Sequence, residues 1–161
     1  MTQFNTYDLK EIIEKKGSVL AFDLGIKKIG VAVGNNVLKT SRNLITFYSK
    51  NKNQRIEKIK QLVNEWQPVY LVLGLPLNQD LSANDTTKFC INTAKDIEKN
   101  INLPIFFVNE NYSSTSAEEF IKDLGNKKQK NNNALVDQVA ANIILQSHFN
   151  EVEKQMRSLD A

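Results

Sequence analysis

Two short apolar segments near the start of the chain, residues 19–22 and 29–33, constrain its fold most strongly. Both are rich in branched side chains and flank a turn with a glycine and two lysines, so the sequence predicts a β-hairpin over residues 18–34. Asp23 stands at the end of the first strand, where a buried core gives way to a polar turn. An acid there is costly to bury unless it is hydrogen-bonded, paired or bound to a metal. Asp23 is therefore the first candidate functional residue.

Three further strands are predicted from composition. Residues 37–48 favour a third strand, interrupted near Ser41. The runs 69–74 and 104–108 are continuously apolar, which is typical of strands buried on both faces in a parallel arrangement. Three strands in succession, followed by strands that alternate with helices, predict an α/β fold with a mixed sheet flanked by helices.

Helices are predicted where apolar residues recur at steps of three or four, or where a capping box marks a helix start. They cover residues 6–16, 53–66, 84–99, 115–124 and 134–154. The lysine- and asparagine-rich segment 125–133 favours a loop, and the tail after about residue 154 is expected to fray. No linker or repeat divides the chain, so we expect a single domain over residues 1–161.

Composition excludes several classes of protein. With 161 residues, 41% hydrophobic and 24% charged, the chain is long and apolar enough for one globular core. The single cysteine, Cys90, and the single histidine, His148, exclude a disulfide framework and a cysteine-based or multi-histidine metal site within one chain. No stretch is apolar enough to span a membrane and no signal peptide is recognisable, so we expect a cytoplasmic protein without a membrane partner.

Three acids occupy positions that a simple core-and-surface pattern does not require. Asp23 and Glu110 end predicted strands, and Asp137 heads an apolar face in the first turn of the last helix. Ligands of open α/β sheets gather at the C-terminal ends of strands. Three carboxylates without histidine suit Mg²⁺ or Mn²⁺, and two such ions about 4 Å apart can promote phosphodiester cleavage. Capping of turns and interaction with the helix dipole are the alternative interpretations.

Basic side chains near Asp23 extend this hypothesis. Lys27 and Lys28 lie in the hairpin turn, where they could contact phosphates or be merely solvated. The net charge of +3 permits a nucleic-acid partner without proving one.

Four segments together resemble the YqgF/RuvX family of ribonuclease H-like proteins, described as Holliday junction resolvases or pre-16S ribosomal RNA nucleases. They cover residues 23–33, 74–78, 110–117 and 136–147, in the family's order. The resemblance implies a ribonuclease H-like mixed five-stranded sheet whose first three strands are antiparallel. It implies that Asp23, Glu110 and Asp137 are catalytic and converge on two divalent metal ions. It also places the loop 74–78 beside the site, with Asn78, Ser113 and Ser114 as candidate substrate-binding residues.

The chain departs from the family pattern at three positions. Asn111 replaces an arginine after the second acid, Lys28 stands where arginine is common, and Leu81 stands where glycine is common. Arginine binds phosphate bidentately and asparagine carries no charge, so the change at Asn111 concerns substrate affinity and activity, not metal binding.

We therefore expect a Mg²⁺- or Mn²⁺-dependent nuclease that processes the 5′ end of pre-16S ribosomal RNA in ribosome biogenesis, as a monomer or homodimer. A Holliday junction resolvase is the first alternative, and it would call for a two-fold dimer. A non-catalytic nucleic-acid binding protein on the same fold is the second. A nucleotide-dependent phosphotransferase is disfavoured. Phosphotransferases with a similar hairpin need a second domain with a second phosphate loop, and this chain is too short for both domains.

Overall fold

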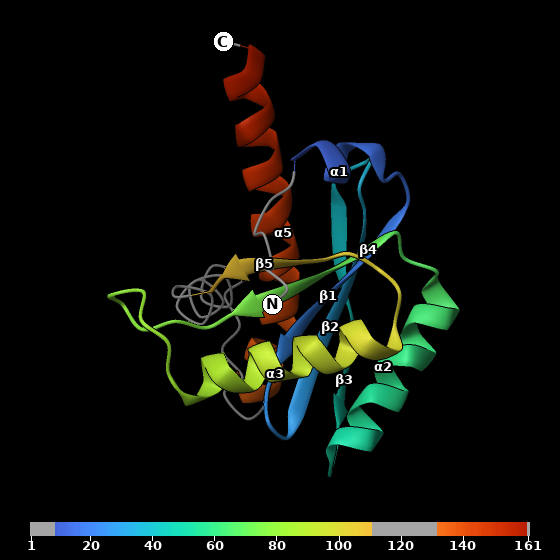
Figure 1. Cartoon of the computed structure of the whole chain (residues 1–161), viewed down its shortest axis with the longest axis vertical. Helices are drawn as coiled ribbons and strands as arrows, with labels where there is room; N and C mark the ends of the chain where they lie inside the picture. The colour runs from blue at the N-terminus through green and yellow to red at the C-terminus, as the bar shows by residue number, and fades with distance from the viewer. Residues whose placement is uncertain (1–8, 111–131, 161) are drawn as a thin grey trace.

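The computed structural model describes residues 9–110 and 132–160, and within the last helix it describes the side chains of residues 139–159. Figure 1 shows the course of the chain. The elements are α1 (Leu9–Glu14), β1 (Ser18–Leu24), β2 (Lys28–Asn35), β3 (Thr40–Tyr48), α2 (Lys52–Trp66), β4 (Tyr70–Leu75), α3 (Asp85–Asn100), β5 (Ile105–Asn109) and α5 (Asn132–Asp160).

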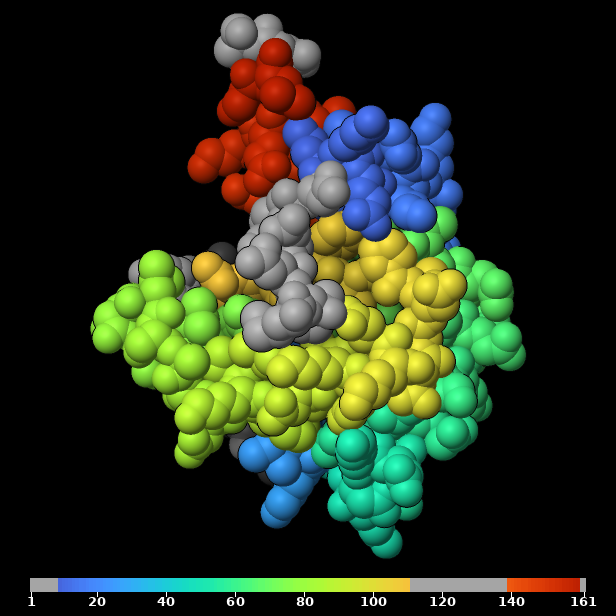
Figure 2. Space-filling model, in the orientation of Figure 1, coloured from blue at the N-terminus to red at the C-terminus, as the bar shows by residue number. Residues whose placement is uncertain are grey.

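A five-stranded mixed sheet of order β3-β2-β1-β4-β5 forms the centre. β1 pairs antiparallel with β2, and β2 with β3, whereas β4 runs parallel to both β1 and β5. This confirms the expected α/β fold with its antiparallel first three strands. Helices α2 and α3 cover one face, which is toward the viewer in Figure 2, and α5 crosses the other.

Side-chain alternation along the strands divides the core into two layers. On β1, Leu20 and Phe22 join the layer under α2 and α3, whereas Val19 and Ala21 join the layer under α5. The α5 layer also includes Val72 of β4 and the first residues of α1. Because Asp23 continues the series of Val19 and Ala21, the alternation turns this acid toward α5.

The third strand differs in detail from the sequence prediction. It begins at Thr40, because the side chain of Asn35 accepts hydrogen bonds from the backbone N–H groups of Val37 and Leu38, at 2.8 and 3.0 Å, and so forms a turn. The interruption predicted near Ser41 is also wrong, because Ser41 is paired with β2. The irregularity in this pair of strands is a register shift between Val31 and Ala32.

The helices extend or shorten the predicted ranges. α1 covers only Leu9–Glu14 of the predicted 6–16, whose first residues lie outside the described part. The last helix is expected to end and fray after about residue 154, but α5 continues to Asp160. Its last residues include neither glycine nor proline, which would end a helix. The predicted helix 115–124 and most of the predicted loop 125–133 lie outside the described residues. None of the helices that the structure describes is both long and apolar enough to cross a bilayer.

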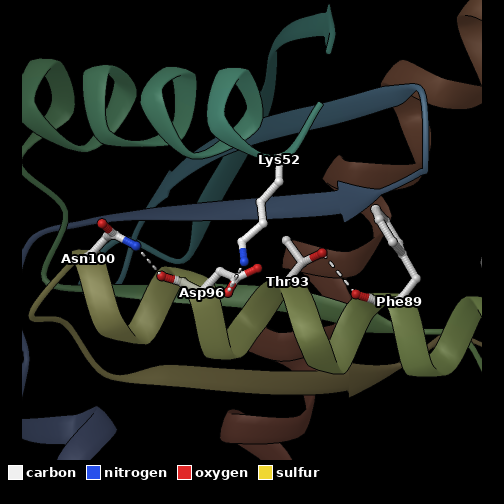
Figure 3. A network of polar contacts seen from close by, with 5 residues as sticks. All are labelled: Lys52, Phe89, Thr93, Asp96 and Asn100. Carbon is white, nitrogen blue, oxygen red and sulfur yellow. Dashed lines mark hydrogen bonds and ion pairs between the residues drawn. The ribbon is translucent and has the colours of Figure 1, made fainter. Parts of the chain in front are cut away.

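Polar contacts join α2 to α3 on the outer layer (Figure 3). The ammonium group of Lys52 lies 3.2 Å from a carboxylate oxygen of Asp96. The buried guanidinium group of Arg55 stacks 4.8 Å above the ring centre of Phe89 and interacts electrostatically with Asp96. Each helix begins at an asparagine cap, Asn51 or Asn84. The outer layer is thus fixed by specific pairs as well as by its apolar contacts.

Candidate active site

The strand topology brings Asp23 and Glu110 to the same edge of the sheet. Asp23 lies near the C-terminal end of β1, and Glu110 follows β5 directly. Both strands run parallel to β4, which lies between them, so their C-terminal ends point the same way. The backbone N–H of Glu110 donates a hydrogen bond of 3.2 Å to the carbonyl of Leu75 at the end of β4. This bond holds Glu110 in line with the sheet.

The two carboxyl groups contact each other. A hydrogen bond links the side chains of Asp23 and Glu110, and the pKa of Glu110 is raised to about 9. Burial is the larger cause, and the negative charge of Asp23 is the next. At neutral pH Glu110 therefore keeps a proton, because two carboxylates this close cannot both be charged without a compensating cation.

Gly74 of β4 provides the space in which the acids meet. A β-carbon on Gly74 would lie 2.6 Å from Oε2 of Glu110 and 2.5 Å from Cδ1 of Ile144 on α5, and real β-carbons do not approach other atoms so closely. Gly74 is paired with Val108 of β5 and follows Leu73, which pairs with Phe22 of β1, so it lies between Asp23 and Glu110. The absence of a side chain at this position lets the carboxyl group of Glu110 lie across the middle strand.

Cys90 of α3 lies close behind this pair on the other layer. Its thiol contacts the carbonyl of Leu24 at 3.6 Å and is fully buried. Burial, with smaller contributions from the negative charges of Glu110 and Asp23, raises the pKa of the Cys90 thiol to about 12. The thiol stays protonated and unreactive, as expected of a thiol in the core.

The turn between β1 and β2 forms a cleft next to Asp23. It has a volume of about 190 Å³ and is lined by Asp23, Gly25, Ile26, Lys27, Lys28 and Gly30. The turn is tight, since the N–H of Gly25 donates to the carbonyl of Lys28 at 2.9 Å. A β-carbon on Gly25 would collide with that carbonyl at 2.5 Å. Both predicted phosphate-contacting lysines therefore line the same cleft as the first acid.

Asn78, predicted to bind substrate, organises the loop after β4. Its amide nitrogen donates to Oγ of Ser82 at 2.9 Å, and its amide oxygen accepts from Nδ2 of Asn84 at 3.0 Å. Leu81 in the same loop has a φ of 70°, in the left-handed region that favours glycine. This conformation explains the glycine common in the resembled family at that position. Leu81 is 61% exposed, so its apolar side chain lies largely in solvent.

Part of the predicted site lies outside the described residues. Asp137 belongs to α5, but its side chain is not among those described, and Asn111, Ser113 and Ser114 are not described at all. Among the described side chains, no three acids, histidines or cysteines come together as a metal-binding group. The site geometry therefore stands on Asp23 and Glu110, and the third carboxylate remains a prediction.

Sequence reasoning included Gly74 only as part of a motif and missed what it does. A glycine inside an otherwise apolar strand was the available signal, because such a residue commonly marks a close approach. The two acids alone could not reveal this role, since it depends on the register of three strands.

The chain is similar to known proteins over most of its length. Residues 17–151 match the family described as "RuvX: Holliday junction resolvase". A "Putative pre-16S rRNA nuclease" from Nitrosomonas europaea is 36% identical over 135 residues, covering 83% of this chain and 89% of the relative. The protein of the same name from Methylobacillus flagellatus is 40% identical over 136 residues, covering 83% and 91%.

The fold is also similar to that of a solved resolvase. RuvC from T. thermophilus, in complex with a Holliday junction substrate, superposes with a TM-score of 0.54 at 12% identity, over 88% of this chain and 96% of that one. At this identity the similarity concerns the fold alone. The sequence match extends through both acids and through α5 as far as residue 151, and by that match the chain belongs to the RuvX family.

Proposed function

We propose that this protein is a divalent-metal-dependent nuclease that hydrolyses phosphodiester bonds, with Asp23, Glu110 and Asp137 as its catalytic carboxylates. The observation that carries the proposal is the half-buried contact between Asp23 and Glu110 at the strand ends. An acid whose proton affinity is raised by burial and by a neighbouring carboxylate destabilises the protein unless something positive joins the pair. A cation site explains why such a pair is present.

The donor set fits a hard cation. Asp23 and Glu110 offer only carboxylate oxygens, the ligands that Mg²⁺ and Mn²⁺ prefer. The cleft beside Asp23 is lined by two lysines, which suits a negatively charged substrate. Asp137 on α5, the helix that packs against the same face, is the expected third ligand.

In this proposal each described residue has a distinct task. Asp23 and Glu110 would hold the metal, with the proton of Glu110 released on binding. Lys27 and Lys28 would bind phosphates of the substrate strand next to the scissile bond. Gly74 would keep the space between the carboxylates open. A bound divalent cation supplies positive charge that stabilises the negative charge developing on the phosphate during hydrolysis.

The favoured substrate is the precursor of 16S ribosomal RNA, because relatives at 36% and 40% identity carry that activity in their names. A DNA four-way junction is the second candidate, because the family description names a Holliday junction resolvase. The two candidate substrates differ in the oligomeric state that they require, since a symmetrical junction calls for a dimer with two sites.

The test compares wild type with Asp23→Asn on three labelled substrates: a pre-16S RNA fragment, single-stranded DNA and a four-way DNA junction. We expect Mg²⁺- or Mn²⁺-dependent cleavage by wild type and a loss of at least about 100-fold in Asp23→Asn, as for removal of a group that stabilises transition-state charge. Glu65→Gln, on the exposed side of α2, removes an acid on the opposite layer and is the matched control.

Equal cleavage by wild type and Asp23→Asn, or cleavage unaffected by a chelator, would contradict the carboxylate mechanism. Cleavage of junctions only, by a dimeric wild type, would replace the RNA substrate with DNA. Metal-dependent binding of RNA without cleavage would favour the non-catalytic alternative.

A further inference from the structure

A second pocket lies at the opposite end of β1 from Asp23. It has a volume of about 230 Å³ and is lined by Ser18, Val33, Gly34, Thr40, Ser41, Arg42 and Trp66. Ser18 begins β1 and Asp23 lies near its end, so they are about 17 Å apart along the strand. Val33 and Trp66 belong to the core layer under α2 and α3, whereas the carboxylates face α5. The pocket is therefore separate from the candidate active site.

Arg42 is held over the edge of this pocket. It pairs with Val33 across the β2–β3 ladder, and its guanidinium carbon lies 5.3 Å from the ring centre of Trp66. Stacking on an aromatic face fixes the guanidinium plane and leaves its N–H groups available to a ligand. Within the described part of the chain, no carboxylate forms an ion pair with Arg42.

The rest of the lining consists of donors and apolar surface. Ser18 and Thr40 contribute hydroxyl groups, whereas the side chain of Ser41 alternates toward the α5 layer, and no acid is among the described residues that line the pocket. The indole N–H of Trp66 is buried without a hydrogen-bond partner among the described residues. Most buried polar groups in proteins are paired, so an unpaired donor beside a cation and two hydroxyls indicates that an acceptor is absent.

We propose that this Arg42–Trp66 pocket binds a phosphate group. The donors come from β1, from β3 and from the end of α2, so they approach an anion from several directions. A tetrahedral phosphate accepts hydrogen bonds in this way, and arginine binds two of its oxygens at once. The phosphate could belong to a free nucleotide or to a nucleic-acid strand, and only the second source rests on the proposed nuclease function.

Trp66 makes the test direct, because it is the only tryptophan of the chain. Asp23→Asn protein, which should not cleave RNA, is titrated with three probes: inorganic phosphate, adenosine monophosphate and a single-stranded RNA oligonucleotide. We expect a saturable change in tryptophan fluorescence, and a chemical-shift change of the indole N–H in NMR spectra. Adding Arg42→Gln should weaken binding at least 10-fold, whereas Arg157→Gln on the exposed end of α5 removes the same charge and should leave it unchanged.

Saturation by phosphate or the mononucleotide identifies a small-molecule site, and saturation by RNA alone identifies a strand contact; either result supports the pocket. Because Arg42→Gln changes the fluorescence of Trp66 itself, its affinity is taken from the NMR titration, and Thr40→Val gives a second variant with Arg42 intact. No saturable response up to millimolar probe, or equal affinity in Arg42→Gln and its parent, would overturn the proposal. Neither result bears on nuclease activity, which is measured with Asp23 intact.

Discussion

Two polar clusters, one buried and one half-buried, lie between the sheet and α5, and they are built on opposite principles. At one end, the Tyr70 hydroxyl lies 2.7 Å from Nε2 of His148 and 3.1 Å from the amide oxygen of Asn36. Asn36 in turn donates to the carbonyl of Ile12 at 2.7 Å, which ties α1 to the sheet. At the other end, Asp23 and Glu110 are both acids. The first cluster joins donors to acceptors, whereas the second joins groups of the same charge.

The difference separates a stabilising cluster from the one that we propose to be functional. Burial, with a smaller contribution from the nearby charge of Lys39, lowers the pKa of His148 to about 3, so the imidazole is neutral. Burial and Asp23 raise the pKa of Glu110 to about 9, so its charged form is available only when a cation compensates it. Buried polar groups that satisfy one another fix the fold, and those that conflict indicate a ligand.

The largest effect is expected from Glu110→Gln, which removes one of the two carboxyl groups that cannot both be charged. As pH rises from about 4.5 to 9, the unfolded state loses the proton of Glu110 while the folded state keeps it, so the wild-type free energy of unfolding falls. At pH 7 this amounts to about 3 kcal/mol. Glu110→Gln should recover that stability without metal and lose nuclease activity.

Urea unfolding between pH 5 and 8, with and without Mg²⁺, measures this effect. Mg²⁺ should stabilise wild type increasingly at higher pH, because the cation replaces the proton, and should not stabilise Glu110→Gln. Glu65→Gln should behave like wild type. If the free energy of unfolding varied with pH in the same way in wild type and Glu110→Gln, Glu110 would not be the group whose pKa is raised in the folded protein.

Gly74→Ala should break the site by steric means. The new β-carbon would contact both Glu110 and Cδ1 of Ile144, so we expect a loss of about 1–3 kcal/mol in stability and at least about 10-fold in Mn²⁺ affinity. Ile144→Val removes that δ-carbon and leaves the carboxylate contact. The double variant should therefore regain stability, measured by urea unfolding, but not Mn²⁺ affinity, measured by calorimetry. Recovery of both would mean that the glycine serves only the packing of α5.

Tyr70→Phe tests the neutral cluster and should have the smallest effect. It removes the hydroxyl that His148 and Asn36 share, at a cost of about 1–3 kcal/mol, with nuclease activity unchanged at temperatures where the protein is folded. In wild type, the contribution of His148 to the free energy of unfolding should fall as pH drops from 6.5 toward 3, because only the unfolded state protonates His148 readily. A loss of metal affinity in Tyr70→Phe would show that the two clusters are coupled through α5.

Local pattern was sufficient to predict the sheet and the positions of the acids. Strand-end acids stand out from sequence because the apolar runs before Asp23 and Glu110 end abruptly. The role of Gly74 could not be predicted, since it arises from the alignment of β4 with β1 and β5, and no local pattern encodes register. The start of β3 was missed because the side chain of Asn35 closes a turn over residues that otherwise resemble a strand. The donors of the Arg42–Trp66 pocket come from three distant segments, which only the folded chain brings together.

The position of α5 also has a consequence for the order of assembly. Its residues Ala141, Ile144 and Leu145 pack into one of the two core layers, and it follows every strand that the structure describes. Until α5 docks, Gly74 and the acids beside it are open to water, where Glu110 lacks the burial that raises its pKa. The raised pKa of Glu110, and the cation affinity that we propose, therefore depend on the docking of α5. A partly synthesised chain that ends before α5 would have both acids and no working site.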